Sequence, residues 1–220
     1  MNIALIVFAG SGTRMHTLLP KQFVKINNQE LVIYTIKKFD DNPNIDEIVL
    51  VTAKDYVYYV EEFKTKYNLK KVVKVVEGGA TRQESVKLGL LATNYDENDN
   101  VLIHDGDRPL VSNTIINECI SYLNEYDAVC PFLHIENRIK EISNSGRTRS
   151  VEGYEVDIQT PQAFKYGLIK SKHVELSEKS FSDDIGLVED STDVKFFIGE
   201  PTNFKITKDN DLAYFEKLLK

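Results

Sequence analysis

The 220-residue sequence lacks tryptophan altogether and contains only two cysteines, Cys119 and Cys130. Their spacing is neither metal-like nor CxxC, so they indicate reduced, buried thiols and exclude a disulfide framework. No apolar run approaches the ~20 residues of a transmembrane helix. The apolar start has no basic leader before it, which argues against a signal peptide. The sequence therefore predicts a cytoplasmic protein.

Positive charge is also scarce, with 27 Lys and Arg against 34 Asp and Glu and a net charge of -7. A field of this sign repels nucleic acid and anionic membranes, so we expect neither as a partner. An anionic substrate would need a local cluster of Lys and Arg. The length and the hydrophobic content of 42% are typical of one soluble domain, which we place over residues 1–220.

What the sequence does contain is a regular alternation of strand and helix patterns. Short, β-branched apolar runs predict buried strands over residues 3–8, 47–51, 71–76 and 100–104. Helical spacing of apolar residues predicts helices over 31–39, 56–67, 81–95 and 112–126. This order predicts an α/β fold with a mostly parallel sheet and helices on both faces.

The alternation breaks after a further strand at 128–135. Residues 138–158 have a strand, a polar turn with glycine and a second strand, which predicts a protruding β-arm. A helix over 164–179, a strand over 194–199 and a helix over 210–219 follow.

The stretch AGSGTRMHTLLPKQF, residues 9–23, follows the first predicted strand. In an open α/β sheet, ligands bind beyond the carboxyl ends of the strands. Gly10 and Gly12 would let backbone N–H groups approach a phosphate, and Arg14 and Lys21 would neutralise it. The simpler interpretation is a tight turn with two solvated cations.

Two known phosphate loops do not fit this stretch. A dinucleotide-binding loop needs a third glycine where this chain has Met15, and a Walker loop needs Gly-Lys-Ser/Thr. A phosphate-binding loop of another kind remains.

The combination of GSGTRM (10–15) and PKQF (20–23) resembles the opening motif of the alditol-phosphate cytidylyltransferases. This family includes the 2-C-methyl-D-erythritol 4-phosphate and ribitol-5-phosphate cytidylyltransferases. Four further motifs are similar to its later signatures, in family order: EGGATRQESVKLGL (77–90), VLIHDGDRP (101–109), IQTPQAF (158–164) and NFKIT (203–207). The resemblance thus covers nearly the whole chain.

The resemblance implies a Rossmann-like nucleotidyltransferase domain that converts CTP and an alditol phosphate into a CDP-alditol and pyrophosphate. It also implies Mg²⁺ as cofactor and a homodimer formed through the 138–158 arm. We expect ribitol 5-phosphate or a similar wall or capsule polyol phosphate as acceptor, with 2-C-methyl-D-erythritol 4-phosphate of isoprenoid synthesis as the alternative. A related enzyme that uses another nucleoside triphosphate and a non-catalytic nucleotide-binding subunit are further alternatives.

The resemblance also assigns roles to individual residues. The catalytic cations are Arg14, Lys21 and Lys205. The nucleotide-binding residues are Ala9, Gly10, Ser11, Gly12, Gly78, Gly79, Arg82, Ser85 and Asp105, with Asp105 also the metal ligand. The acceptor-binding residues are Asp107, Arg108 and Thr160.

Some of these residues have ordinary structural interpretations as well. Thr81 could simply cap the next helix, with Arg82 solvated in its first turn. We expect His104 to have a structural role, since the reaction needs no titrating histidine. Asp183 or Asp184 either assists the metal or polyol or belongs to a solvated turn.

The sequence departs from the family pattern at three places. Phe8 stands where relatives usually have a small residue. Asp107 stands where they have a small or apolar residue, and Asn137-Arg138 stands where they have Asp-Thr. Asp107 could temper the charge of Arg108 or bind acceptor hydroxyls. The last two changes fall on the acceptor side, so they bear on which polyol phosphate is used.

Overall fold

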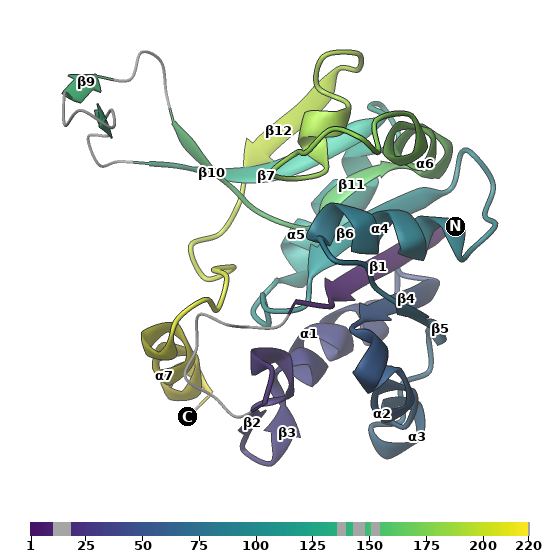
Figure 1. Cartoon of the computed structure of the whole chain (residues 1–220), viewed down its shortest axis with the longest axis vertical. Coiled ribbons are helices and arrows are strands. Elements are labelled where there is room, and N and C mark those ends of the chain that lie inside the picture. Colours follow the sequence, from purple (N-terminus) through teal and green to yellow (C-terminus); the bar gives the residue numbers. More distant parts are fainter. Residues whose placement is uncertain (11–18, 136–139, 143–147, 151–154, 220) are drawn as a thin grey trace.

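A computed structural model of the chain describes residues 1–10, 19–135, 140–142, 148–150 and 155–219. Its central feature is an eight-stranded sheet (Figure 1). The strands are β1 (Asn2–Phe8), β4 (Glu47–Thr52), β5 (Val72–Glu77), β6 (Asn100–Asp105), β7 (Ala128–His134), β10 (Val156–Ile158), β11 (Gln162–Lys165) and β12 (Val194–Ile198). Their spatial order is β10-β7-β11-β6-β1-β4-β5, with β12 also paired to β7.

The predicted parallel sheet is confirmed for β6, β1, β4 and β5, with β1 between β6 and β4. The other half is mixed, because β11 is antiparallel to both β6 and β7. Phe164 and Lys165, which the helical pattern assigned to a helix, are the last residues of β11. Phe164 is fully buried in the sheet, and the helix begins at Tyr166 instead.

The α-helices of the described residues are α1 (Leu31–Asp40), α2 (Val57–Glu61), α3 (Phe63–Lys66), α4 (Arg82–Leu91), α5 (Asn113–Tyr122), α6 (Tyr166–Glu175) and α7 (Asp209–Leu218). Three 3₁₀ turns are η1 (Lys21–Phe23), η2 (Lys54–Tyr56) and η3 (Ile185–Leu187). The continuous helix predicted over 56–67 is wrong. It divides at Glu62, whose ψ of -22° has the tighter value of a 3₁₀ turn. None of the helices described is long and apolar enough to cross a bilayer.

Helices cover both faces of the sheet, as the sequence predicts (Figure 1). Along β1, Ala4, Ile6 and Phe8 pack into the core with α1 and α5, while Leu5 and Val7 pack on the opposite face with α4 and α6. Gly89 lets α4 lie close to this second face, since a Cβ there would be 2.7 Å from Leu5 Cδ1. Cys119 and Cys130 are free and buried, one in each core.

A smaller hairpin joins the first loop to α1. It consists of β2 (Lys25–Ile26) and β3 (Gln29–Glu30), and a third apolar cluster formed by Ile26, Leu31, Ile206 and Phe215 packs α7 against it. This cluster brings the C-terminal segment back to the beginning of the chain, where α7 lies beside β2 and β3 (Figure 1).

The side chain of Glu30 is completely buried at the start of α1. It accepts hydrogen bonds from Lys66 Nζ at 2.7 Å and Tyr59 OH at 2.5 Å, and another from Tyr67 OH. Burial alone would raise the pKa of Glu30, but these hydrogen bonds outweigh it and lower the pKa to about 2. The carboxylate therefore links α2 and α3 to the hairpin as a charged group.

The structure contains strands within the predicted strand-turn-strand segment 138–158. β8 (Lys140–Ile142) and β9 (Thr148–Ser150) pair antiparallel and lie apart from the main sheet, beyond β7 and β10 (Figure 1). The turn between them and Asn137-Arg138 lie outside the described residues.

Candidate active site

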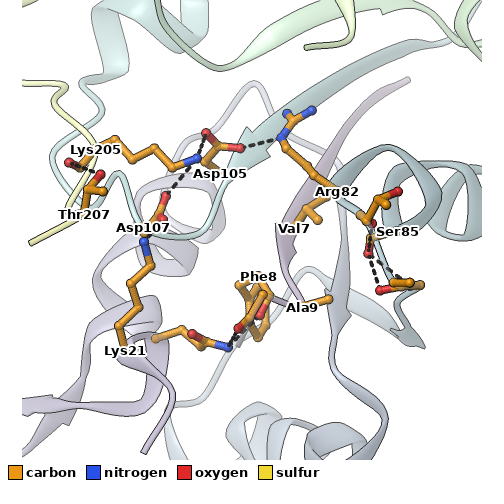
Figure 2. Close-up of a pocket in the computed structure, with 15 residues that line it drawn as sticks. Val7, Phe8, Ala9, Lys21, Arg82, Ser85, Asp105, Asp107, Lys205 and Thr207 are labelled. Atoms are coloured by element: carbon orange, nitrogen blue, oxygen red, sulfur yellow. Dashed lines mark hydrogen bonds and ion pairs between the residues drawn. The ribbon is translucent and has the colours of Figure 1, made fainter. Parts of the chain in front are cut away.

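A pocket lies where the carboxyl ends of β1 and β6 meet the start of α4 (Figure 2). This is the edge of an α/β sheet at which ligands usually bind, and the described residues there enclose about 310 Å³. The predicted site residues that line it are Ala9, Gly10, Lys21, Gly79, Arg82, Ser85, Asp105, Asp107 and Lys205. Ser11, Gly12 and Arg14 lie outside the described residues.

Asp105 is the hub of the charged groups in the pocket (Figure 2). One carboxylate oxygen accepts a hydrogen bond from Arg82 Nε and the other from Lys205 Nζ, each at 2.9 Å, and Arg108 Nε lies 3.6 Å away. Burial alone would raise the pKa of Asp105, but the three positive charges outweigh it and hold the pKa well below its ordinary value. Asp105 is therefore a permanent anion that positions cations rather than an acid or base.

Arg82 is the first residue of α4, whose N-terminus is capped by the Thr81 hydroxyl. The capping role of Thr81 is thus confirmed, but Arg82 is not a solvated surface residue. Its Nη1 donates to the buried Asp184 at 2.7 Å, while Nη2 is buried with no hydrogen-bond partner among the described residues. Arg82 itself lines the pocket.

Asp184 precedes η3 and is almost completely buried. Its second oxygen contacts His173 Nε2 at 3.0 Å. Burial would raise the pKa of Asp184, but Arg82 and His173 together lower it. The expectation of a solvated turn is therefore wrong for Asp184, whose carboxylate is occupied by Arg82 and His173 instead of facing a metal or polyol.

Lys21 enters the pocket from η1, on the side opposite Arg82 (Figure 2). Its Nζ donates to the Ile206 carbonyl at 2.8 Å and forms an ion pair with Asp107 Oδ2 at 2.5 Å. Lys205 Nζ lies 3.9 Å from the other oxygen of Asp107. Two lysines from opposite ends of the chain and two aspartates of one turn thus form a line of alternating charge across the pocket.

The sequence that carries these motifs matches a known family along almost its whole length. The family model of IspD, 2-C-methyl-D-erythritol 4-phosphate cytidylyltransferase, matches residues 2–220. This chain belongs to the IspD family. It is a cytidylyltransferase, as the sequence predicts.

Curated relatives and solved structures agree with this assignment. A 2-C-methyl-D-erythritol 4-phosphate cytidylyltransferase of Clostridium novyi is 40% identical over 99% of this chain and 96% of its own length. The 4-diphosphocytidyl-2C-methyl-D-erythritol synthase of Anaerococcus prevotii superposes with a TM-score of 0.85 at 29% identity, covering 99% of this chain and 95% of that one. A Thermus thermophilus 2-C-methyl-D-erythritol 4-phosphate cytidylyltransferase gives 0.77 at 26% identity, with 99% and 98% covered.

In this IspD-family chain, Gly78 lies behind the pocket, where it packs against Ala9. A Cβ on Gly78 would be 2.5 Å from Ala9 Cβ, so only glycine allows the two loops to approach this closely. Ser85 accepts a hydrogen bond from Gly79 N at 3.0 Å and donates to Thr81 O at 2.8 Å. The Ser85 hydroxyl thereby shapes the loop at the predicted base pocket.

Arg108 and Thr160, predicted to bind the acceptor phosphate, lie behind Asp105 and are not among the residues that line the pocket. Arg108 is buried, and its Nη1 donates to the Asn203 carbonyl at 2.8 Å. Thr160 Oγ1 accepts from Asp105 N at 3.1 Å. In the structure these residues support the backbone and charge of Asp105, and their contact with the acceptor phosphate stays a prediction. The suggestion that Asp107 tempers Arg108 is corrected, since its ion-pair partner at 2.5 Å is Lys21.

His104 has the structural role predicted for it. Its ring is fully buried, with Nδ1 hydrogen-bonded to Thr160 Oγ1 at 3.0 Å, and burial lowers its pKa to about 3. The imidazole is therefore neutral at physiological pH and holds Thr160 in place.

Asp105 fits the role of a protein-bound metal ligand poorly. Both of its oxygens are occupied by cationic donors. Within the described part of the chain, no group of three or more His, Cys, Asp or Glu is placed to hold a metal ion. The carboxylates of the pocket are thus arranged to bind lysine and arginine.

Sequence reasoning missed two residues of this site. Gln22 lines the pocket, and its Nε2 donates to the carbonyls of Phe8 and Gly10, each at 2.9 Å, which fixes the end of β1. Thr207 also lines the pocket, next to Lys205. Gln22 belongs to the PKQF motif and Thr207 to the NFKIT motif. In both motifs the sequence analysis assigned a role only to the lysine.

Proposed function

We propose that this protein transfers the cytidylyl group of CTP to 2-C-methyl-D-erythritol 4-phosphate, forming 4-diphosphocytidyl-2-C-methyl-D-erythritol and pyrophosphate. The observation that carries the proposal is the match to the family model over residues 2–220, supported by the Clostridium novyi relative of that name. The sequence favoured ribitol 5-phosphate and held this acceptor as the alternative. The family description and the relatives quoted above support the alternative.

In the proposed reaction, a phosphate oxygen of the acceptor attacks the α-phosphorus of CTP. The bond from that phosphorus to the oxygen bridging to the β-phosphorus breaks, and pyrophosphate leaves. No proton has to be transferred, so the protein contributes position and positive charge. Lys21, Lys205 and Arg82 supply this charge in the pocket. We assign Arg14 to the same task on its motif.

We further propose that Mg²⁺ enters as its complex with CTP rather than at a site preformed by the protein. Mg²⁺ typically binds phosphate oxygens and keeps several waters, with one or two carboxylates at most. Since both Asp105 oxygens already accept hydrogen bonds from Arg82 and Lys205, isothermal calorimetry should detect no Mg²⁺ binding to the protein without nucleotide.

The proposed function is tested by pyrophosphate release with CTP and Mg²⁺ against a panel of acceptors. The panel holds 2-C-methyl-D-erythritol 4-phosphate, ribitol 5-phosphate, glycerol 3-phosphate and a hexose 1-phosphate. We expect turnover with the first alone, and with CTP in preference to ATP, GTP or UTP. Turnover with ribitol 5-phosphate alone would contradict the proposed acceptor. Binding of CTP without turnover of any acceptor would favour the non-catalytic subunit.

We also propose a homodimer formed through the 138–158 arm. Its support is the β8–β9 hairpin, which lies apart from the main sheet.

A further inference from the structure

Asp107 is the carboxylate by which this chain departs from the small or apolar residue expected at its position, and its backbone is tightly held. It lies in the turn after β6, in which Arg108 N donates to Asp105 O at 3.1 Å. The Asp107 carbonyl accepts a hydrogen bond from Ile206 N at 2.9 Å. The residue is 9% exposed and lines the pocket, so its side chain faces a ligand from a fixed position.

The two oxygens of this carboxylate have different surroundings. Oδ2 forms the 2.5 Å ion pair with Lys21 Nζ. Oδ1 is buried and has no hydrogen-bond partner among the described residues, since Lys205 Nζ at 3.9 Å is beyond hydrogen-bond distance. A buried carboxylate oxygen without a donor is unfavourable, so a donor supplied by a bound ligand would stabilise it.

The chemistry of the two substrates decides which donor fits. The triphosphate and the acceptor phosphate carry no hydrogen at their ionised oxygens and are repelled by a carboxylate. The cytosine and ribose are expected at the opposite end of the pocket, near Gly79 and Ser85. A hydroxyl of the polyol is the remaining donor, and it is the part of the acceptor that differs among alditol phosphates.

We propose that Asp107 is a specificity-determining residue of the acceptor site. Its Oδ1 accepts a hydrogen bond from a hydroxyl of the alditol phosphate, while its Oδ2 holds Lys21 in the pocket. The carboxylate also orients the acceptor, because its negative charge directs the hydroxyl end toward Asp107 and the phosphate end away from it. This inference rests on the proposed function. It adds to that function the residue that recognises a hydroxyl of the polyol.

The test compares Asp107→Ala and Asp107→Asn with the wild type in steady-state assays that vary acceptor and CTP separately. A hydrogen bond from a neutral group to a charged one corresponds to roughly a 10- to 100-fold effect. We expect Asp107→Ala to raise KM for the acceptor by about this factor, and to raise KM for CTP by a smaller factor through the lost ion pair with Lys21. Asp107→Asn keeps one side-chain oxygen that can accept a hydrogen bond, so it should raise KM for the alditol phosphate by a smaller factor.

Two comparisons separate recognition from a structural effect. Asp190→Asn makes the same charge change as Asp107→Asn at an exposed position away from the pocket, and should behave as the wild type. Deoxy analogues of the acceptor, each lacking one hydroxyl, should include one for which wild type and Asp107→Ala have the same KM, because the recognised hydroxyl is already gone. If Asp107→Ala fails to fold, Asp107→Asn carries the same comparison.

The outcomes distinguish this inference from the proposed function. A wild type that turns over 2-C-methyl-D-erythritol 4-phosphate, with an unchanged acceptor KM in both Asp107 variants, overturns the role of Asp107 alone. An effect that persists with every deoxy analogue also overturns it, since no hydroxyl is then recognised. A wild type inactive with every alditol phosphate overturns the proposed function, and the inference with it.

Discussion

Replacing Asp184 by Asn tests whether the ion pair between Asp184 and Arg82 is needed to position Arg82 in the pocket. The substitution keeps the size of the side chain but removes the negative charge that Arg82 Nη1 reaches at 2.7 Å. The new amide group would also present N–H to either Arg82 or His173, both of which now contact a carboxylate oxygen. Arg82 would then keep the hydrogen bond from Nε to Asp105 but lose the charged contact that fixes the end of its guanidinium group.

The expected loss can be worked out from this contact. A hydrogen bond between charged groups contributes about 1.5–3 kcal/mol, and about 1.4 kcal/mol corresponds to a factor of ten. If that energy serves to hold Arg82 against the nucleotide, kcat/KM for CTP should fall by about 10- to 100-fold in Asp184→Asn. The assay is pyrophosphate release under varied CTP, with the melting temperature measured on the same preparation.

Two further variants make the result specific. Asp183→Asn makes the same change one residue away. Among the described residues its carboxylate accepts from Gly186 N at 3.0 Å and from the Ser182 hydroxyl, and this variant should lose less than about threefold. In an Arg82→Lys background, Asp184→Asn should cause little additional loss, because coupled residues are not additive. Full additivity of the two changes, or equal losses in Asp183→Asn and Asp184→Asn, would refute the reasoning.

Three other predictions follow from features away from Asp184. Glu30 has a pKa of about 2 against an ordinary value of 4.5. Its charge therefore stabilises the fold by on the order of 3 kcal/mol above pH 4.5, and this stabilisation is lost as the pH falls toward 2. Chemical unfolding of Glu30→Gln and the wild type should differ at pH 7 and converge toward pH 3, whereas a constant gap would contradict this account. Lys205→Met should lower kcat by about 100- to 1,000-fold, since the side chain acts through its charge; retained turnover would remove Lys205 from the catalytic set. Light scattering should give the mass of a dimer that becomes monomeric when the β8–β9 hairpin is replaced by a short turn. A monomeric full-length enzyme with full activity would exclude the arm as a required interface.

The sheet could be predicted from the sequence because its evidence is local. Each residue of β1 after Asn2 is buried on one face or the other, so the strand is apolar throughout. The pocket was also predictable, because residues that follow the carboxyl ends of adjacent strands must meet at one edge. The antiparallel β11 was missed, since the helical pattern that begins at Tyr166 extends back over Phe164 and Lys165.

The direction of each side chain was less predictable than its position. Arg108 donates to the carbonyl of Asn203, 95 residues later, a contact that no local pattern in the sequence indicates. The pairing of Lys21 with Asp107 joins two motifs that no local pattern relates. Such choices depend on which partners the fold supplies at close range, and therefore they become visible only in three dimensions.

The segment that completes the pocket arrives late in synthesis. Lys21 donates to the carbonyl of Ile206, across 185 residues of sequence, and Lys205 joins Asp105 across 100. At typical translation rates of 5–20 residues per second, roughly 10–40 s separate the two ends of the first contact. The sheet strands β1, β4, β5 and β6 all precede that segment in the chain, so a nascent chain can build the framework of the site well before it can organise the charges within it. The charges of the pocket can therefore be brought together only after nearly the whole chain has been synthesised.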